Sequence, residues 1–318
     1  MAAFSSPSSP VVSPPAASAD AVIAVVVSYN TGAGITQVVQ AALAECSRVI
    51  VVDNGSDAET LAAIDDAGGA GAVHVIRNPD NRGLAPAQNQ GIAAALAAGA
   101  TAVLLLDHDS VVQPGLVAAL GAALANGAAV AAPDLDLGPN GRRTTFLPAD
   151  HRWRVRRVAA QDLAGRPVAF AIASGSLIPR QTLARVGLMR DAFAIDYVDI
   201  DFCLRVIAAG GRVEVVPTAR LHHRLGDPGR RAGVRVTNHS VGRRFTIWRN
   251  RVVLWREWAG RMPGWVVSDM AAGAVDLVRI LWAEQNRLAK LAAAWRGLIA
   301  GLVRRPAAAP ALDQTPAA

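Results

Sequence analysis

The chain has 318 residues, of which 52% are apolar, so it can bury one large core or two modest ones. Its net charge is +7, but residues 220–305 contain 17 Lys and Arg against 5 Asp and Glu, a net +12 that leaves −5 for the rest. This basic part suggests an anionic partner, either nucleic acid or a membrane surface. Cys46 and Cys203 belong to no Cys/His cluster, which argues against zinc and a disulfide framework and favours a reducing cytosol.

Both ends of the chain have a composition that is typical of disordered segments. Residues 1–19 are rich in Ser, Pro and Ala and have neither the positive charge nor the apolar segment of a signal peptide. We expect a second disordered tail at residues 306–318. Residues 110–133 carry no charge, but Pro114 and several glycines interrupt them, so we reject a membrane span there.

Four short runs rich in Val, Ile and Leu predict buried strands, at residues 21–28, 48–53, 72–76 and 102–107. Such runs are typical of a parallel sheet covered on both faces. Ser56 to Glu59 matches a capping box and predicts a helix over residues 58–67, and Pro86 lies near the start of a helix that continues over 88–98. The alternation predicts a doubly wound α/β fold, in which ligands gather at the carboxyl ends of the strands.

The pattern after Pro133 is less regular. We expect these elements: a loop at 134–148, an Arg-rich segment at 151–157, a strand at 168–179, helices at 183–186 and 199–209, and a strand at 212–217. From residue 237 onward the chain is predicted to be helical, with a break at residues 262–264.

Asp107 and Asp109 form a DxD motif directly after the fourth predicted strand. Mg²⁺ and Mn²⁺ prefer oxygen ligands, and Mg²⁺ often joins one or two carboxylates to phosphate oxygens. The pair therefore indicates a metal and diphosphate site. The alternative is a polar turn in which Asp109 or Ser110 caps the next helix. We expect no role for His108.

Asp53 ends the second predicted strand and is followed by an Asn-Gly turn. Its carboxylate suits a hydrogen bond from the N3–H group of uracil or thymine, although it could equally cap the turn. Gly83 precedes a predicted helix whose N-terminus favours phosphate. The polar residues 88–90 inside that helix either face a ligand or form its solvated side.

Asp196, Asp199 and Asp201 lead into a predicted helix. The helix dipole alone favours acids there, and the functional alternative makes one of them a general base. His222 and His223 follow a predicted strand, and one of them could supply a third metal ligand. A solvated surface pair is the other interpretation.

In this order, the segments resemble family 2 glycosyltransferases and, among them, the bacterial rhamnosyltransferases. The motifs that carry the resemblance are Val27–Asn30, Val52–Ser56, Asn81–Gly83, Asn89–Gly91, Asp107–Ser110, Ser174–Ser176, Asp196–Asp201 and His223–Gly226. Each motif is modest, but the ordered set is specific and covers about residues 21–255. Arg249-Asn250 also resembles a family signature, without an assigned role.

The resemblance implies an inverting transfer by a GT-A fold, a Rossmann-like, mostly parallel sheet with flanking helices and a C-terminal helical extension. It implies a catalytic domain at residues 20–255, and the spacing of apolar and basic residues after it predicts a basic amphipathic extension at 256–305. Asp199 matches the catalytic base, with Val198 where a Glu often stands. Asp107, Asp109 and His223 would hold Mg²⁺ or Mn²⁺. The nucleotide-sugar would be bound by Ser28, Asn30, Asp53, Asn81, Gly83, Asn89, Asp107 and Ser176, with Asp53 on the pyrimidine.

The resemblance also implies an activity: transfer of L-rhamnose from dTDP-rhamnose to a glycan or lipid-linked acceptor in cell-envelope polysaccharide synthesis. Galactofuranose and other hexoses are the rival donors. An enzyme that makes NDP-sugars would show a Gly-rich basic loop near the N-terminus, which residues 29–32 are not. A nonenzymatic binding module would leave Asp107, Asp109, Asp199 and His223 without a purpose.

Apolar residues and Trp recur at helical spacings between residues 264 and 305, with Arg among them. Trp and Arg favour a membrane interface, which predicts peripheral membrane contact where a lipid-linked acceptor would lie. The alternative is packing on the catalytic domain or on a second subunit of a homo-oligomer. We expect no nucleic acid partner, and a location in the cytoplasm at the inner face of the membrane.

Overall fold

A computed structural model of the chain describes residues 21–68, 71–137, 143–149, 157–223, 230–231, 234–235, 238–305 and 307–312. The expected N-terminal tail, nearly all of the Arg-rich segment at 151–157, and the final residues 313–318 lie outside the described residues.

The first half contains β1 (Val22–Ser28), α1 (Gly34–Leu43), β2 (Arg48–Asp53), α2 (Ala58–Ala67), β3 (Val73–Arg77), α3 (Leu84–Ala97), β4 (Ala102–Asp107), β5 (Ser110–Val112), α4 (Leu116–Ala125) and β6 (Val130–Asp136). The second half contains β7 (Thr145–Phe146), β8 (Val158–Ala159), η2 (Ala160–Leu163), β9 (Leu177–Pro179), α5 (Arg180–Val186), η3 (Asp191–Phe193), α6 (Val198–Ala208), β10 (Val213–His223), β11 (Arg230–Arg231), β12 (Val234–Arg235), α7 (Val241–Trp258), α8 (Pro263–Ala283) and α9 (Arg287–Val303).

A mixed, mostly parallel sheet forms the centre of the fold. Its strand order is β3-β2-β1-β4-β9-β6-β10-β5. β3, β2, β1 and β4 run parallel, β6 and β10 run parallel, and β9 and β5 pair antiparallel with their neighbours. The parallel strands are Val-, Ile- and Leu-rich because helices cover both of their faces.

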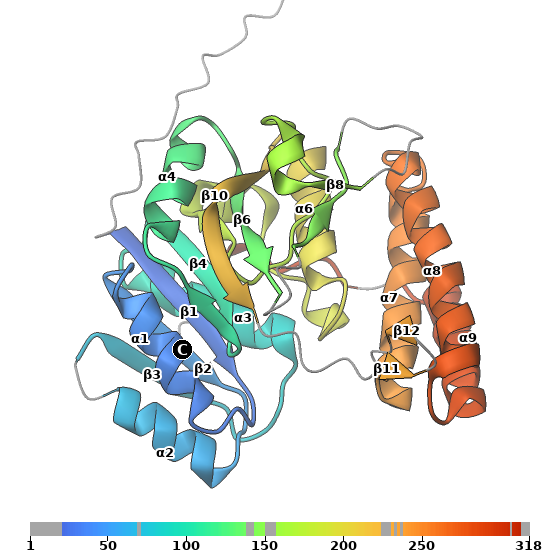
Figure 1. The fold of residues 1–318 in the computed structure, drawn as a ribbon, viewed down its shortest axis with the longest axis horizontal. Coiled ribbons are helices and arrows are strands. Elements are labelled where there is room, and N and C mark those ends of the chain that lie inside the picture. Colours follow the sequence, from blue (N-terminus) through green and yellow to red (C-terminus); the bar gives the residue numbers. More distant parts are fainter. Residues whose placement is uncertain are drawn as a thin grey trace, which may run out of the picture.

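Side chains of β1 alternate between two hydrophobic cores. Ile23, Val25 and Val27 belong to the core that α3, α6 and α7 share. Val22 and Val26 point to the opposite face and belong to the core that includes α1 and α4. Figure 1 shows α1 and α2 on one side of the molecule and α7, α8 and α9 on the other. The sheet therefore lies between helical layers, as the α/β pattern predicts.

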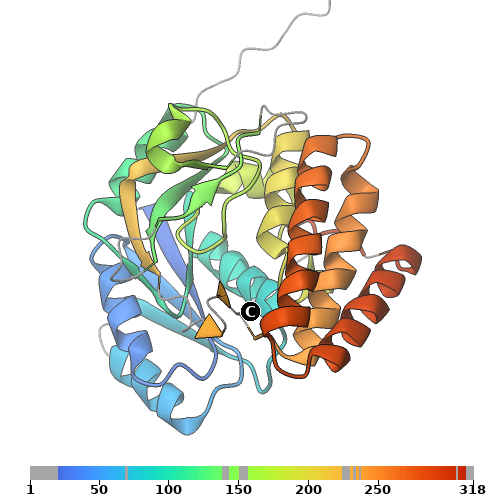
Figure 2. The same cartoon turned by 45° about the vertical axis from the view of Figure 1, so that its right-hand side comes forward.

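The C-terminal helices form a packed group. In Figure 2 they lie side by side at the edge of the α/β body. A Cβ added at Gly297 of α9 would lie 2.4 Å from the Phe245 carbonyl oxygen, and one at Gly301 would lie 2.6 Å from the Arg249 carbonyl oxygen. Glycines at these positions therefore let α9 approach the backbone of α7. Among the described helices, none combines the length and apolarity needed to cross a membrane.

The four predicted strands and the helix at 58–67 are confirmed, with ends that differ by at most one residue. The cap of that helix is different from the prediction. Asp57, not Ser56, is the N-cap, and its Oδ1 accepts a hydrogen bond of 2.9 Å from the Thr60 N–H group.

Three predictions from the second half need correction. The strand expected at 168–179 is limited to β9, because Gly175, at φ 83°, turns the chain just before it. The loop expected at 134–148 contains the end of β6 and also β7. In the expected tail, residues 307–312 pack on the domain, where the Pro310 carbonyl accepts a hydrogen bond from the Leu188 N–H group. The expected boundary between the catalytic domain and the extension, at 255/256, lies within α7, and the division into domains stays a prediction.

Candidate active site

Three polar residues lie at the carboxyl ends of adjacent central strands. In the parallel register Ser28 pairs with Asp53, and Val27 pairs with Asp107. The ends of β1, β2 and β4 therefore meet at one edge of the sheet, which is where open α/β sheets bind ligands.

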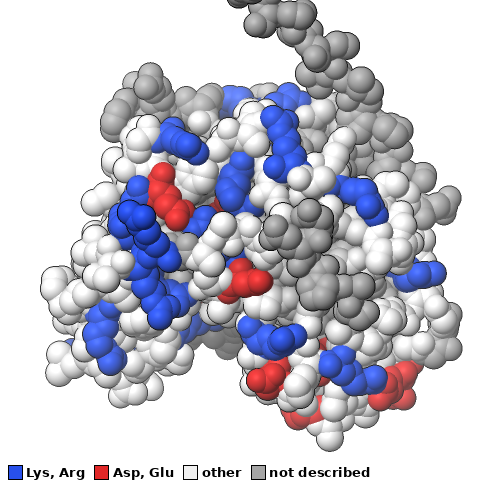
Figure 3. Space-filling model, turned by 180° about the vertical axis from the view of Figure 1, so that it is seen from behind, with Lys and Arg blue, Asp and Glu red and all other residues white. Residues whose placement is uncertain are grey.

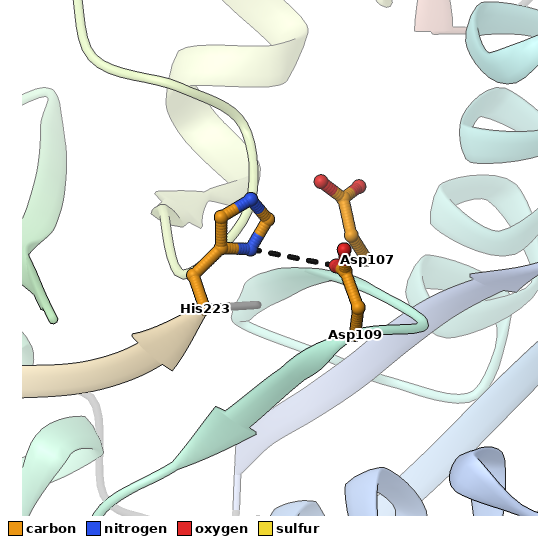
Figure 4. Close-up of side chains that lie close together, drawn as sticks. All are labelled: Asp107, Asp109 and His223. Carbon is orange, nitrogen blue, oxygen red and sulfur yellow. Dashed lines mark ion pairs between the residues drawn. The ribbon is translucent and has the colours of Figure 1, made fainter. Parts of the chain in front are cut away.

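Asp107, Asp109 and His223 form a cluster at this edge. Asp107 ends β4, Asp109 lies in the turn to β5, and His223 ends β10. Each offers a ligand atom, and these atoms all lie within 4.8 Å of one another. Figure 4 shows the three side chains converging, and the His223 Nδ1 atom lies 3.4 Å from the Asp109 Oδ1 atom. Residues more than 100 positions apart in the chain thus build one site.

Two serine hydroxyls connect this cluster to the backbone. Ser174 Oγ accepts a hydrogen bond of 2.9 Å from the Asp107 N–H group and donates one of 2.7 Å to Ser110 Oγ. Ser110 Oγ lies 2.6 Å from His223 Nδ1. The chain of contacts orients Asp107 and the imidazole relative to each other.

The alternation of side chains along β10 places His222 and His223 on opposite faces of the strand. His223 is opposite Ser110 in the antiparallel pairing with β5 and is buried. His222 is more exposed and its Nδ1 atom lies 3.9 Å from Asp136. Neighbouring side chains on a strand point to opposite faces, so only His223 joins the two carboxylates.

The cluster fits a divalent cation on its own chemistry. Two carboxylates and an imidazole suit Mn²⁺ or Mg²⁺ when phosphate oxygens complete the shell. The Asp109 Oδ1 atom is buried without a hydrogen-bond partner, as expected of a metal ligand. Burial lowers the pKa of His223, against the opposing charge of Asp109, which keeps the imidazole neutral and able to ligate. Burial and the charge of Asp109 raise the pKa of Asp107 to about 6.

The three acids at the start of α6 have different partners. Asp196 forms two hydrogen bonds of 3.0 Å with Arg243. Asp201 is fully buried and forms ion pairs of 2.9 Å with Arg190 and Arg205. Asp199 has no basic partner among the described residues, and its Oδ1 accepts a bond of 2.9 Å from the Ile200 N–H group.

Asp199 also lies within electrostatic range of the metal-type cluster. Burial raises the pKa of its carboxyl to about 6, and the charges of Asp107 and Asp196 contribute to the increase. An unpaired acid with a raised pKa beside a candidate metal site is suited to proton transfer.

The loop just before α6, the helix whose first turn contains Asp199, is held by α7. Ala194, Asp196 and Tyr197 all have positive φ, which is unfavourable for residues other than glycine. The Asn250 side-chain amide donates to the carbonyls of Phe193, Ile195 and Asp196 at 3.1, 3.1 and 2.9 Å. The strained backbone is therefore stabilised from a helix about 50 residues further along the chain.

Two predicted nucleotide-binding residues have buried atoms without partners. Asp53 Oδ2 accepts bonds of 3.2 Å from the N–H groups of Gly55 and Ser56, whereas its Oδ1 atom has no partner. The Ser28 hydroxyl is also buried and unpaired. Asn30, in contrast, is exposed, and its Oδ1 accepts a bond of 2.9 Å from Asp57 N–H.

The other four predicted binding residues make contacts within the protein. Asn81 Oδ1 accepts a bond of 2.9 Å from Gly83 N–H, and a Cβ at Gly83 would lie 3.0 Å from Ala194. The Asn89 amide is bonded to Met189 and Asp191, and the Ser176 hydroxyl to the Ile172 carbonyl. These contacts give all four a structural part, and their contact with a nucleotide-sugar stays a prediction.

Sequence reasoning missed the roles of Ser174 and Asn250. Both stand in motifs that carry the family resemblance, but the motif does not say which atom each side chain contacts. Only the folded chain brings Ser174 to the end of β4 and Asn250 to the loop before α6.

An α/β sheet with a DxD cluster at its carboxyl edge, and a separate unpaired acid at the start of α6 that feels the charge of Asp107, is the arrangement expected of a GT-A transferase. The family model described as "Glycosyl transferase family 2" matches residues 23–187, which is more than half of the chain. The protein belongs to this family of enzymes. The match ends before Asp199 and His223, so their place beside the DxD motif comes from the geometry.

Known relatives agree with this assignment. The chain is 28% identical over 226 residues to a dTDP-rhamnosyl transferase, RfbF, of Shigella flexneri, covering 66% of this chain and 71% of the relative. The mannosyltransferase PcManGT of Pyrobaculum calidifontis, solved with GDP-Man and Mn²⁺, has a TM-score of 0.54 at 17% identity over 89% of this chain and 86% of its own.

A second solved structure has the same fold. S. aureus TarS 1-349 in complex with UDP has a TM-score of 0.51 at 14% identity and covers 87% of this chain and 70% of its own. The chain spans 43% of the length of the longer TarS structure. At these identities the solved structures establish the fold alone.

Proposed function

We propose that this enzyme transfers L-rhamnose from dTDP-rhamnose, with inversion, to a glycan or lipid-linked acceptor in cell-envelope polysaccharide synthesis. The observation that carries the proposal is the cluster of Asp107, Asp109 and His223 at one sheet edge, combined with an unpaired acid, Asp199, whose pKa the charge of Asp107 helps to raise. The choice of rhamnose is supported by the 28% identity to a dTDP-rhamnosyl transferase.

The donor half of the proposal is supported by the unpaired atoms at the strand ends. The buried Asp53 Oδ1 atom is an acceptor without a donor, and the N3–H group of thymine would supply one. Asp107, Asp109 and His223 would hold Mg²⁺ or Mn²⁺. The ion would neutralise negative charge on the leaving diphosphate.

The reaction then needs a base on the acceptor side. Asp199 takes the proton of the acceptor hydroxyl while the oxygen forms a bond to C1 of the sugar. The bond from C1 to the phosphate oxygen breaks, and its electron pair leaves with the nucleoside diphosphate. Asn250 and Arg243 hold the loop that positions Asp199.

We propose that the reaction takes place in the cytoplasm. Cys46 and Cys203 are free and buried, which suits a reducing compartment.

The test combines a donor screen with an Asp199→Asn variant. Purified enzyme is incubated with dTDP-rhamnose, UDP-galactofuranose and other NDP-sugars, with and without Mn²⁺, and release of the nucleotide is measured. We expect metal-dependent turnover with dTDP-rhamnose. Asp199→Asn should lower transfer by about 10²- to 10⁴-fold and leave donor binding unchanged, because the base acts on the acceptor.

Asp162→Asn is the matched control, since Asp162 is an exposed acid in η2. Near-normal turnover of Asp199→Asn would refute its assignment as the base. Metal-dependent use of another NDP-sugar alone would refute rhamnose but keep the transferase mechanism.

A further inference from the structure

The exposed large apolar side chains of the described residues are concentrated on α8 and α9. Apart from Tyr29, all of them lie between residues 267 and 303. The most exposed are Trp282 at 80%, Val303 at 78% and Leu288 at 77%. The apolar face comprises Val267, Met270, Val275, Val278, Leu281, Trp282, Leu288, Trp295, Ile299, Leu302 and Val303. Large apolar side chains that are exposed and concentrated in this way mark an interaction site.

Helix α8 has both of its acids, Asp269 and Asp276, on the inside and six of its large apolar side chains on the outside. Asp269 accepts hydrogen bonds of 2.9 Å from the Tyr197 hydroxyl and 2.8 Å from the Trp255 indole. Asp276 forms an ion pair of 2.8 Å with Arg244 of α7. A surface helix of a water-soluble domain normally has the opposite arrangement. The polar contacts fix the orientation of α8, so its apolar face points outward.

The charges around this face have one sign. Residues 263–305 are all described, and their exposed charged side chains are arginines only: Arg279, Arg287, Arg296, Arg304 and Arg305. The three acids of this segment and Lys290 are paired within the protein. Figure 3 shows the molecule from behind, with the C-terminal helices on the left. Lys and Arg predominate on that side, with one acidic side chain visible among them, and other Asp and Glu side chains appear near the centre and at the lower right.

We infer that the α8/α9 face binds an anionic membrane surface, with its apolar side chains in the interface and its arginines on lipid headgroups. Trp and Arg together favour that environment. A second copy fits less well. A two-fold interface would bring the arginines of this face close to the arginines of the second copy, with no exposed acid on α8 or α9 to neutralise them.

The close packing of α9 on α7 supports the inference. Ala293, Ala294, Gly297 and Gly301 are the buried side of α9, and the glycines touch the α7 backbone. Because small residues already fill that contact, the large side chains of α9 have no room to turn inward. The apolar face is a fixed feature of the helical group.

The test measures flotation of the full chain with vesicles of phosphatidylcholine alone or mixed with phosphatidylglycerol. We expect binding to the mixed vesicles that weakens with salt. Replacing Trp282 and Trp295 together by Ser should lower partitioning by at least about tenfold, because both rings would leave the interface. Replacing Arg296 by Ser should lower it by about fivefold.

Arg48→Ser is the matched control for charge, because Arg48 is exposed at the start of β2, away from the helical group. We expect it to bind vesicles within about twofold of the unchanged protein. The circular dichroism spectrum should not change in any variant, since all the replaced side chains are exposed. Lipid binding is measured without donor or acceptor, so the result is independent of the sugar transferred.

Two results would overturn the inference. One is a failure of the protein to bind phosphatidylglycerol vesicles, or vesicle binding that does not change when Trp282 and Trp295 are replaced. The other is self-association, measured by light scattering without lipid, that is lost when both tryptophans are replaced, in a protein that does not bind vesicles. The face would then be an interface between two copies.

Discussion

Asp199 can accept a proton only when its carboxyl is ionised. Burial and the charges of Asp107 and Asp196 raise its pKa to about 6, so the reactive form predominates above that value. We predict that kcat/KM falls as the pH decreases through about 6, approaching tenfold per pH unit below it. The measurement is the pH profile of kcat/KM for sugar transfer, with a circular dichroism check that the enzyme stays folded. A profile that is flat between about pH 5 and 7 would contradict the assignment of this base.

Ser174 and Ser176 provide a matched pair of hydroxyls on the same short segment. Ser174 contacts the Asp107 backbone and Ser110, whereas Ser176 bonds the Ile172 carbonyl. We predict that Ser174→Ala weakens Mn²⁺ binding by about tenfold. The Asp107 N–H group and the Ser110 hydroxyl, which orient the ligands Asp107 and His223, would lose their contact with Ser174. Titration calorimetry with Mn²⁺ measures this effect. Ser176→Ala should bind Mn²⁺ normally, and equal losses in both variants would point to a general disturbance of the fold.

At the scale of single elements, α7 connects the C-terminal helical group with the loop before α6. Asn250 anchors three carbonyls of that loop and Arg243 pairs with Asp196. The Arg249-Asn250 motif, which the sequence left without a role, therefore stabilises the loop before α6 through Asn250.

We predict that Asn250→Ala lowers kcat by at least about tenfold, because Asp199 loses its fixed position. The affinity for the donor should change little, since the donor cluster lies at the ends of β4 and β10. The free energy of unfolding should fall by about 1–3 kcal/mol, because buried carbonyls lose their donors. Steady-state kinetics and urea unfolding measure both effects.

Thr246→Ala is the control, because the Thr246 hydroxyl bonds only to a carbonyl of the same helix, that of Gly242. If Asn250→Ala lowers the stability but leaves kcat unchanged, Asn250 stabilises the fold and does not position Asp199.

Gly91 decides how closely α3 can approach the sheet. A Cβ there would lie 2.3 Å from a methyl carbon of Val25 and 3.1 Å from one of Val52. We therefore predict that Gly91→Ala lowers the free energy of unfolding by about 1–3 kcal/mol. Gly242→Ala is the control, because it is a helical glycine with no atom within 4 Å of an added Cβ. That change should be neutral or stabilise by up to about 1 kcal/mol. Equal melting temperatures for the two variants would contradict the tight packing of α3.

At the scale of the whole molecule, two surfaces have different chemistry. The carboxyl edge of the sheet carries the acids Asp53, Asp107 and Asp109, and the outer face of α8 and α9 carries only arginines among its exposed charges. The exposed arginines of the outer helical face therefore account for part of the excess of basic residues in the composition, whereas paired residues such as Arg244, with Asp276 and Glu284, add nothing to it.

The sequence by itself determined the strands β1, β2, β3 and β4 and the acids that end β2 and β4, because a buried parallel strand has a local signature of continuous apolar residues. It also determined the family through ordered motifs. Local pattern could not decide which of Asp196, Asp199 and Asp201 lacks a basic partner, or which of His222 and His223 faces the carboxylates. Those choices depend on contacts between residues far apart in the chain, which exist only after β10 pairs with β5 and α7 packs against the loop before α6. The tertiary structure alone also decided which side of α8 faces outward, because Asp269 and Asp276 contact Tyr197 and Arg244 inside the protein and leave large apolar side chains such as Trp282 exposed.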